Sequence, residues 1–411
     1  MAIRIYSLLL CLGLCWAPML RAEAQATIQG QVTDARTKEP LPFAGVFLAN
    51  TTYGTTADSI GQYRLGGVAP GQYEMVVSYL GYQLYKKTIT VQQSVTMPIA
   101  LQPAAAQLGE VVVRPKNKPA DYQKFTRLFL GNSALSLKCR IENPQEVYVA
   151  YDPAARELTA VAPKTLKVLN PVLGYRITYH RLDFKVNYRM GTVTLLGWPV
   201  FEELTPANPQ QQQHWLEQRR QAYLGSLAHF LRSVRTNQVQ SEGFVVRPLI
   251  TEPDNPQTQL HVQQAGDSLA AVQTLNGLTS RIYQQELAAA DIRRLVPDTT
   301  HVQLQYKHSL QVTYVAEKPE DTFVAETRMQ RQFAQQEMQK RKYMGSNTNA
   351  IIRGTTDPVQ QVSEIRFLGP VAEIQPNGYL LNPLSIRVDG YWGYERVGES
   401  LPLDYTPSLL K

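Results

Sequence analysis

The chain has 411 residues, of which 44% are hydrophobic, and a formal net charge of +7. This length suits two to three domains, and no apolar run of about 18 residues follows the first segment, which excludes a bundle of membrane-spanning helices. The positive charge is dispersed, and the pairs Arg219–Arg220 and Arg293–Arg294 stand alone, so no basic stripe for nucleic acid is present.

The first 24 residues predict a cleaved export signal. Arg4 provides a short positive region, residues 5–16 are almost entirely apolar, and Ala22-Glu23-Ala24 has the small-x-small pattern of a cleavage site. The apolar run is shorter than the roughly 20 residues that a membrane span needs. We therefore expect an exported mature chain that begins at Gln25 and has no transmembrane segment.

Residues 25–102 predict a β-sandwich. Apolar and polar residues alternate along Ile28–Val32, as in a strand with one buried face. Further short strands are expected at Met75–Val77, Leu84–Val91 and Val95–Leu101, separated by Gly and Pro turns. Asp58 precedes Gly61 by three residues, so we expect its carboxylate to bind turn amides and Gly61 to adopt a positive φ.

This segment contains five short motifs: Gly30-Gln-Val-Thr-Asp34, Pro40-Leu-Pro-Phe-Ala-Gly-Val46, Gly54-Thr-Thr-Ala-Asp-Ser-Ile-Gly-Gln-Tyr63, Gly71-Gln-Tyr73 and Ser78-Tyr-Leu-Gly-Tyr82. In this order they resemble the carboxypeptidase-regulatory-like domain, an N-terminal extension of SusC-like TonB-dependent receptors and of other exported envelope proteins. The resemblance implies a seven-stranded, transthyretin-like sandwich in the periplasm or at the outer membrane. Related folds bind carbohydrate, which Tyr53, Tyr79 and Tyr82 could stack on, although such tyrosines more often pack across strands.

Residues 103–119 are expected to form a linker that contains one strand. Leu108-Gly-Glu-Val-Val-Val113 resembles the segment that follows the same domain in TonB-dependent receptors. No plug or barrel sequence follows, so transport by this chain alone is not expected. Glu110, Val111, Val112 and Val113 are instead predicted to add a strand to the sheet edge of an envelope protein, such as an outer-membrane complex.

Residues 120–411 predict a β-rich α+β region. Alternation over Leu182–Tyr188 and along a long run from Val302 to Tyr314, with further strands at Ile365–Phe367 and Ile386–Val388, indicates sheets with one buried and one wet face. One helix is expected from Pro209 to Thr236, with an apolar stripe of Leu216, Tyr223, Leu227, Phe230 and Val234. A polar helix over Asp321–Lys342 is expected to form an exposed arm, followed by a sub-boundary near residues 345–357. Phrases such as Leu173–Tyr179 and Gly243–Val246 resemble a C-terminal region, without established activity, that often follows this sandwich.

Catalytic patterns are weak throughout the chain. His214-x-x-Glu217, with His301 or His308 as a third ligand, is the pattern of a zinc peptidase, but His214 falls on the solvent face of its helix. Cys139 is the one cysteine after cleavage and is expected to be a small buried thiol. We therefore expect no enzymatic activity, no metal and no cofactor.

Tyr391, Trp392 and Tyr394 form an aromatic cluster that could stack on a ligand, with aromatic packing at a terminal turn as the alternative. The sequence as a whole predicts an exported envelope protein for binding and scaffolding. The alternatives are a carbohydrate-binding protein and, more remotely, a zinc-dependent peptidase.

Overall fold

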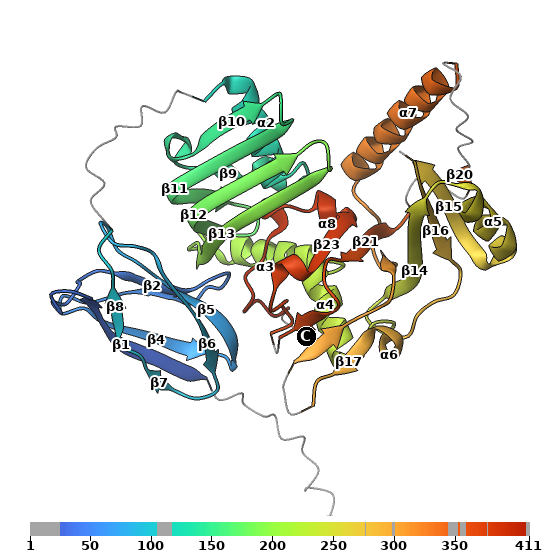
Figure 1. The fold of residues 1–411 in the computed structure, drawn as a ribbon. Coiled ribbons are helices and arrows are strands. Elements are labelled where there is room, and N and C mark those ends of the chain that lie inside the picture. The colour runs from blue at the N-terminus through green and yellow to red at the C-terminus, as the bar shows by residue number, and fades with distance from the viewer. Residues whose placement is uncertain are drawn as a thin grey trace, which may run out of the picture.

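The chain folds into a sandwich followed by two larger β-sheets with helices (Figure 1). The computed structural model describes residues 25–104, 117–275, 277–297, 301–343, 352–353, 359–375 and 377–407. The predicted signal segment, most of the linker and most of the predicted sub-boundary lie outside these residues. The mainly β architecture confirms the predicted fold class.

The sandwich consists of two sheets with the orders β4-β1-β7 and β3-β2-β5-β6, and β8 also pairs with β1. Strands β7 and β8 pair one after the other, and in parallel, with β1. If they are counted as one interrupted strand, the sandwich has seven strands. The strands are β1 (Ala26–Asp34), β2 (Gly45–Leu48), β3 (Gly54–Thr56), β4 (Gln62–Val68), β5 (Gly71–Ser78), β6 (Tyr85–Val91), β7 (Val95–Thr96) and β8 (Ile99–Leu101).

The turn before β4 forms as its sequence predicts. The Asp58 carboxylate accepts the N–H groups of Ile60 at 2.9 Å and Gln62 at 2.8 Å. Gly61 has φ 74°, a conformation that only glycine adopts readily, and a Cβ there would collide with the Val32 carbonyl. The turn therefore fixes the end of the sandwich from which β4 starts.

The second unit is a five-stranded antiparallel sheet covered by helix α2 (Pro119–Leu130). Phe125 and Phe129 of this helix are fully buried, and both pack against Phe184. One side of β12 faces this core, which confirms the alternation predicted over Leu182–Tyr188 as far as Val186; Tyr188 lies beyond the strand and is 38% exposed. The strands are β9 (Arg140–Ile141), β10 (Tyr148–Asp152), β11 (Glu157–Asn170), β12 (Tyr175–Asn187) and β13 (Thr192–Glu203), with short helices η2 (Ser136–Lys138) and η3 (Pro144–Glu146).

The predicted single helix over Pro209–Thr236 is two helices, α3 (Pro209–Tyr223) and α4 (Leu227–Thr236). Gly225 between them has φ 75°, which ends α3, and the Ser226 hydroxyl accepts the His229 N–H and caps α4. The prediction of a continuous helix was wrong because the apolar stripe continues across the break, and helical spacing alone does not reveal a glycine turn.

Gly225→Ala is expected to lower the free energy of unfolding by about 2 kcal/mol, because the residue must keep a positive φ and its Cβ would lie 2.7 Å from the Tyr314 ring. Gly81→Ala is the matched control: Gly81 has φ 86° but no atom within 4 Å of a built Cβ. Urea denaturation of both variants separates the two effects. Equal losses in the two proteins would show that packing against Tyr314 contributes nothing.

The third unit is a seven-stranded sheet with the order β20-β15-β16-β14-β19-β21-β23. Phe244, Val312 and Ile365 on one face pack with α4, whereas the other face carries the aligned polar row Arg247, Gln311, Glu364 and Asp389. The strands are β14 (Phe244–Pro253), β15 (Leu269–Leu275), β16 (Leu278–Tyr283), β19 (Ser309–Tyr314), β20 (Ile352–Arg353), β21 (Gln361–Phe367) and β23 (Ile386–Gly390). The two faces agree with the predicted buried and wet sides.

The long strand predicted from Val302 to Tyr314 is interrupted. Its first part is β18 (Val302–Leu304), which lies in a separate three-stranded sheet between β17 (Arg293–Leu295) and β22 (Ala372–Ile374), and its second part is β19. Alternating burial holds in both parts, so the pattern predicted strands correctly but could not show that the chain changes sheets between them.

Helix α7 (Asp321–Tyr343) projects from the molecule, which agrees with the predicted arm (Figure 1). Its first turns are anchored, because Phe323 packs on Tyr391 and Glu326 pairs with Arg127. The remaining short elements are α5 (Pro256–Ala265), η4 (Gly266–Ser268), α6 (Ala289–Ile292), η5 (Pro383–Ser385), α8 (Tyr391–Tyr394) and η6 (Val397–Glu399). Among the described residues, no helix combines the length and apolar character that crossing a membrane requires.

Candidate functional site

The predicted partner-binding residues Glu110, Val111, Val112 and Val113 lie outside the described residues. The predicted ligand-stacking residues can be placed. Tyr391 and Trp392 are each only 6% exposed, and the Trp392 indole N–H donates to the Gly225 carbonyl at 2.7 Å. These two rings pack inside the molecule and offer no face to a ligand, so aromatic packing describes their role.

Tyr394 is half-buried beside the start of α7. Its ring lies 5.3 Å from that of Phe323, and its hydroxyl donates to the Glu320 carboxylate at 3.1 Å. Tyr394 therefore helps to anchor the helix rather than completing an open aromatic surface with Tyr391 and Trp392.

The residues of the zinc alternative do not form a ligand set. His214 is exposed on α3, as its helical position predicts, and Glu217 binds Arg220 and Gln221 of the same helix. Over the part of the chain that the structure describes, no group of three His, Cys, Asp or Glu side chains is arranged to hold a metal.

Cys139 packs at the edge of the core under α2, and burial raises the pKa of its thiol to about 12. A thiol that stays protonated at neutral pH is a poor nucleophile. Cys139 is partly buried, so it is less enclosed than the small buried thiol that the sequence predicts.

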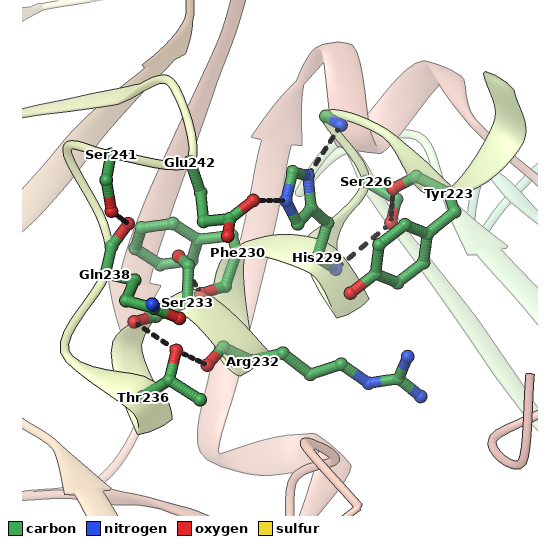
Figure 2. A network of polar contacts seen from close by, with 11 residues as sticks. Tyr223, Ser226, His229, Phe230, Arg232, Ser233, Thr236, Gln238, Ser241 and Glu242 are labelled. Carbon is green, nitrogen blue, oxygen red and sulfur yellow. Dashed lines mark hydrogen bonds and ion pairs between the residues drawn. The ribbon is translucent and has the colours of Figure 1, made fainter. Parts of the chain in front are cut away.

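His229 on α4 is the centre of a buried polar network (Figure 2). Its Nδ1 accepts the Gly225 N–H at 3.1 Å, so the neutral ring carries its proton on Nε2 and donates to Glu242 Oε2 at 3.0 Å. Burial among Tyr223, Phe244 and Tyr314 lowers the pKa of His229, and Glu242 opposes that change.

A histidine oriented by a carboxylate is half of a nucleophile-activating triad. The other ring nitrogen of His229 would have to face a hydroxyl or thiol, but it accepts the Gly225 N–H instead. Ser226 is close by, yet its hydroxyl donates to the Tyr223 carbonyl and caps the helix. The network therefore holds α4 against the sheet and is not set up for nucleophilic catalysis.

Arg232, one turn after His229, holds the C-terminal strap, which we define as residues 400–407. Its guanidinium donates to the carbonyls of Asn377 at 3.1 Å, Leu403 at 2.9 Å and Tyr405 at 2.8 Å. A side chain at position 378 would collide with Arg232, and Gly378 has φ 83°. Sequence patterns did not single out Arg232, because its partners are backbone carbonyls distant in sequence.

The strap also binds the sandwich. The Leu403 N–H donates to the Asn50 carbonyl at 2.7 Å, and the Asp404 carboxylate accepts both the N–H and the hydroxyl of Thr52. The same loop pairs with β13, because Asn50 N–H donates to Pro199 at 2.6 Å and Phe201 N–H donates to Thr51 at 2.9 Å. We call the contacts of residues 49–53 with β13 and the strap the joint.

Apolar contacts reinforce the joint. Phe47, Ala49 and Val76, on the outer side of the second sandwich sheet, pack with Trp198 and Val200 of β13. The Lys86 ammonium lies 4.0 Å from the centre of the Trp198 ring, and Phe47 stacks on His180 at 4.2 Å. Burial here lowers the pKa of His180 to about 4, so this ring is neutral at neutral pH. The joint thus fixes the sandwich by one sheet face and one end.

The opposite end of the sandwich exposes three large apolar side chains, which we call the apolar tip: Phe43 (69% exposed), Ile60 (53%) and Leu80 (91%). They lie on the three loops β1–β2, β3–β4 and β5–β6. Phe43 has φ 62°, a rare and costly conformation for a bulky side chain, as seen at functional surfaces. The sequence already hinted at this apolar tip, because all three residues lie inside turn motifs, where exposed residues are usually polar.

Four glutamates meet where the strap, α8 and the start of α7 converge: Glu317, Glu320, Glu395 and Glu399. The Glu399 carboxylate accepts the Ser133 hydroxyl, and Glu320 accepts the Ala134 N–H at 3.1 Å. Burial raises the pKa of Glu399 to about 7 and that of Glu395 well above its ordinary value, and the neighbouring carboxylates add to both effects. We therefore expect the charge of this junction to change near neutral pH.

Comparison with known proteins supports the N-terminal assignment. Residues 28–113 match the family model of the CarboxypepD_reg-like domain, which confirms the predicted resemblance for this segment. The match runs through Val113 and so includes the predicted docking strand. No curated protein matches the chain.

Solved structures are similar only in part, and three examples follow. The pilus 2b backbone protein of group B streptococcus is 17% identical with a TM-score of 0.18, covering 20% of this chain and 42% of that one. Catechol 1,2-dioxygenase from Pseudomonas arvilla is 14% identical with a TM-score of 0.18, covering 22% and 56%. A candidate carbohydrate-binding protein from Bacteroides uniformis is 10% identical with a TM-score of 0.17, covering 44% and 99%. The chain thus spans about half the length of the first two, and these likenesses assign no function.

Proposed function

We propose that this protein, whose residues 28–113 match the CarboxypepD_reg-like domain, is an exported, non-enzymatic scaffold of the cell envelope that docks a partner through its sandwich and the adjoining strand. The observation that carries the proposal is the joint. It ties the sandwich to two other parts of the chain, so a partner bound to the sandwich would be held at a fixed position relative to the larger β-rich region.

The other observations agree with a binding role. The joint occupies one end of the sandwich and leaves the loops at the other end open. The polar network at His229 and the strap contacts of Arg232 serve to fix elements relative to one another. Export, and with it a place in the periplasm or at the outer membrane, rests on the signal-like first 24 residues.

The test is cross-linking in intact cells, followed by co-purification. A scaffold is expected to co-purify with an outer-membrane complex, and deletion of residues 108–114 is expected to abolish that association if the Glu110–Val113 strand is the docking element. Unchanged association after the deletion would show that the Glu110–Val113 strand is not the docking element. Recovery of the protein only from the cytoplasm would overturn the envelope assignment.

A further prediction concerns the role of Asp404 in the joint. Asp404→Ala is expected to weaken attachment of the sandwich by about 2 kcal/mol, because it leaves the Thr52 N–H and hydroxyl without their acceptor. Small-angle scattering should then report a larger radius of gyration. Asp267→Ala, at an exposed position in η4, is the control and should leave the radius unchanged. A compact Asp404→Ala protein would show that the strap does not hold the sandwich.

A further inference from the structure

The apolar tip is formed by loops that the strand register brings together. Gly45 pairs with Ser78, and from this pair the chain continues to Phe43 on one side and Leu80 on the other. The Phe43 N–H donates to the Ala57 carbonyl at 3.1 Å, three residues before Ile60. All three loops therefore lie at one end of the sandwich, away from the joint at the other end of β2.

The shape of the tip favours a deformable partner. Each apolar side chain stands on a separate loop and is more than half exposed. A polar pocket lies near the opposite end of the sandwich, where Thr27, Gln29, Arg64 and Ser94 line it. Protruding side chains of this kind suit insertion between lipid headgroups better than docking on a rigid surface.

The charges of the tip suit phosphate-bearing headgroups. Arg36 and Lys38 are exposed on the same loop as Phe43, and the Lys38 ammonium donates to the Ala35 carbonyl at 2.8 Å. Arg36 is among the groups that lower the pKa of Asp34, but no salt bridge joins either cation to a carboxylate in the described part of the chain. The carboxylates nearby bind local donors: Asp34 takes the Arg36 and Thr37 N–H groups and the Tyr82 hydroxyl, Asp58 takes two turn amides, and Glu39 takes the Thr37 hydroxyl.

Two tyrosines complete the arrangement. Tyr79 and Tyr82 flank Leu80, with their ring centres 5.3 Å apart, and each is partly buried against the sandwich core. Tyrosines at this position are typical of the boundary between headgroups and hydrocarbon, because one end of the ring is apolar and the other is polar.

We propose that the apolar tip, Phe43, Ile60 and Leu80, inserts into the surface of a phospholipid bilayer. The proposal rests on the envelope location in the proposed function and adds the class of surface that the sandwich meets. Arg36 and Lys38 contact headgroup phosphates while the three apolar side chains enter the boundary of the hydrocarbon.

The test is co-sedimentation of the chain that begins at Gln25 with vesicles of phosphatidylcholine alone and of phosphatidylcholine mixed with phosphatidylglycerol. The wild type is expected to bind both, and the mixed vesicles more tightly. The triple variant Phe43→Asn, Ile60→Ser, Leu80→Ser is expected to bind at least about tenfold more weakly to both, because it removes the apolar contribution. Asn is chosen at position 43 because it tolerates a positive φ.

The matched control is the triple variant Leu137→Ser, Leu295→Ser, Leu384→Ser, which removes side chains of similar exposure (68%, 66% and 58%) outside the sandwich. It should bind like the wild type. Arg36→Gln with Lys38→Gln should weaken binding to the mixed vesicles severalfold and to phosphatidylcholine alone much less. In a separate Leu80→Trp variant, tryptophan emission should shift to shorter wavelength when vesicles are added.

A wild-type protein that binds neither vesicle, or a tip variant that binds as well as the wild type, would overturn the proposal. If vesicle binding is absent but the tip variant loses a protein cross-linked in cells, the tip contacts a protein and the lipid assignment is wrong. Loss of a cross-linked protein would still be compatible with the proposed scaffold function. Recovery of the protein only from the cytoplasm would contradict the proposed function itself.

Discussion

Arg232→Ala is expected to lower the free energy of unfolding by about 3 kcal/mol and to release the C-terminal strap. The guanidinium donates to three carbonyls, at 2.8–3.1 Å, that belong to Asn377, Leu403 and Tyr405. Alanine leaves all three carbonyls without this donor and also removes the cation from the Tyr223 ring, 5.3 Å away. Urea denaturation measures the loss, and hydrogen exchange should show faster exchange at Leu403, whose N–H binds the sandwich.

Two variants calibrate this result. Arg232→Lys keeps the charge but cannot reach three carbonyls with one planar fork, so we expect an intermediate loss. Arg64→Ala is the control, because this exposed arginine makes a single long hydrogen bond to Gln29 and should change stability by less than about 0.5 kcal/mol. If Arg232→Ala matched Arg64→Ala, the strap would not depend on the guanidinium.

The contribution of Glu399 to stability is expected to fall as the pH rises from about 5 to about 8, and the difference between the wild type and Glu399→Gln separates it from the opposite contributions of His180 and His229. The folded state raises the pKa of this carboxyl from 4.5 to about 7 through burial, against the hydrogen bond from Ser133. The folded protein therefore binds the proton more tightly than the unfolded chain. This contribution is complete below about pH 4.5 and disappears as the pH passes 7. Because solvent still reaches part of the Glu399 side chain, we expect its contribution to the free energy of unfolding to change by roughly 2 kcal/mol.

Glu399→Gln tests the assignment, since glutamine still accepts the Ser133 hydroxyl and carries no charge at any pH. The variant should match the wild type near pH 5 and exceed it at pH 8. Glu39→Gln, at an exposed position, should leave the profile unchanged. Glu395 also has a raised pKa, so Glu395→Gln should reduce the dependence of stability on pH that remains in the Glu399→Gln protein. Wild-type and Glu399→Gln proteins whose stabilities differ by the same amount at pH 5 and at pH 8 would show that the fold does not raise the pKa of Glu399.

Most of the sandwich could be predicted from the sequence because its determinants are local. Asp58 and Gly61 bring about their turn through backbone groups within four residues, and the alternation along β1 decides which side chains are buried. The resemblance to the carboxypeptidase-regulatory-like domain rests on the same turns, and the family match confirms it. The polar helix α7 and the two-faced sheets were predicted for the same reason.

The candidate surfaces were harder to predict. The aromatic cluster at Tyr391 and Trp392 has a composition suited to ligand stacking, but its exposure depends on α4 and α7, which are distant in sequence. In contrast, Phe43, Ile60 and Leu80 are ordinary residues of turn motifs, and only the pairing of Gly45 with Ser78 brings their loops together.

The sequence by itself determined the periods and several turns of this protein, because these depend on residues a few positions apart. It predicted a β-sandwich for the N-terminal domain and the mixed character of the rest. The tertiary structure alone decided where the α3–α4 helix breaks, to which sheet β18 and β19 belong, and how Arg232 and Asp404 join three parts of the chain. The contacts of Arg232 and Asp404 join groups more than a hundred residues apart, which carry no pattern in the sequence, whereas the break between α3 and α4 is hidden by an apolar stripe that continues across it.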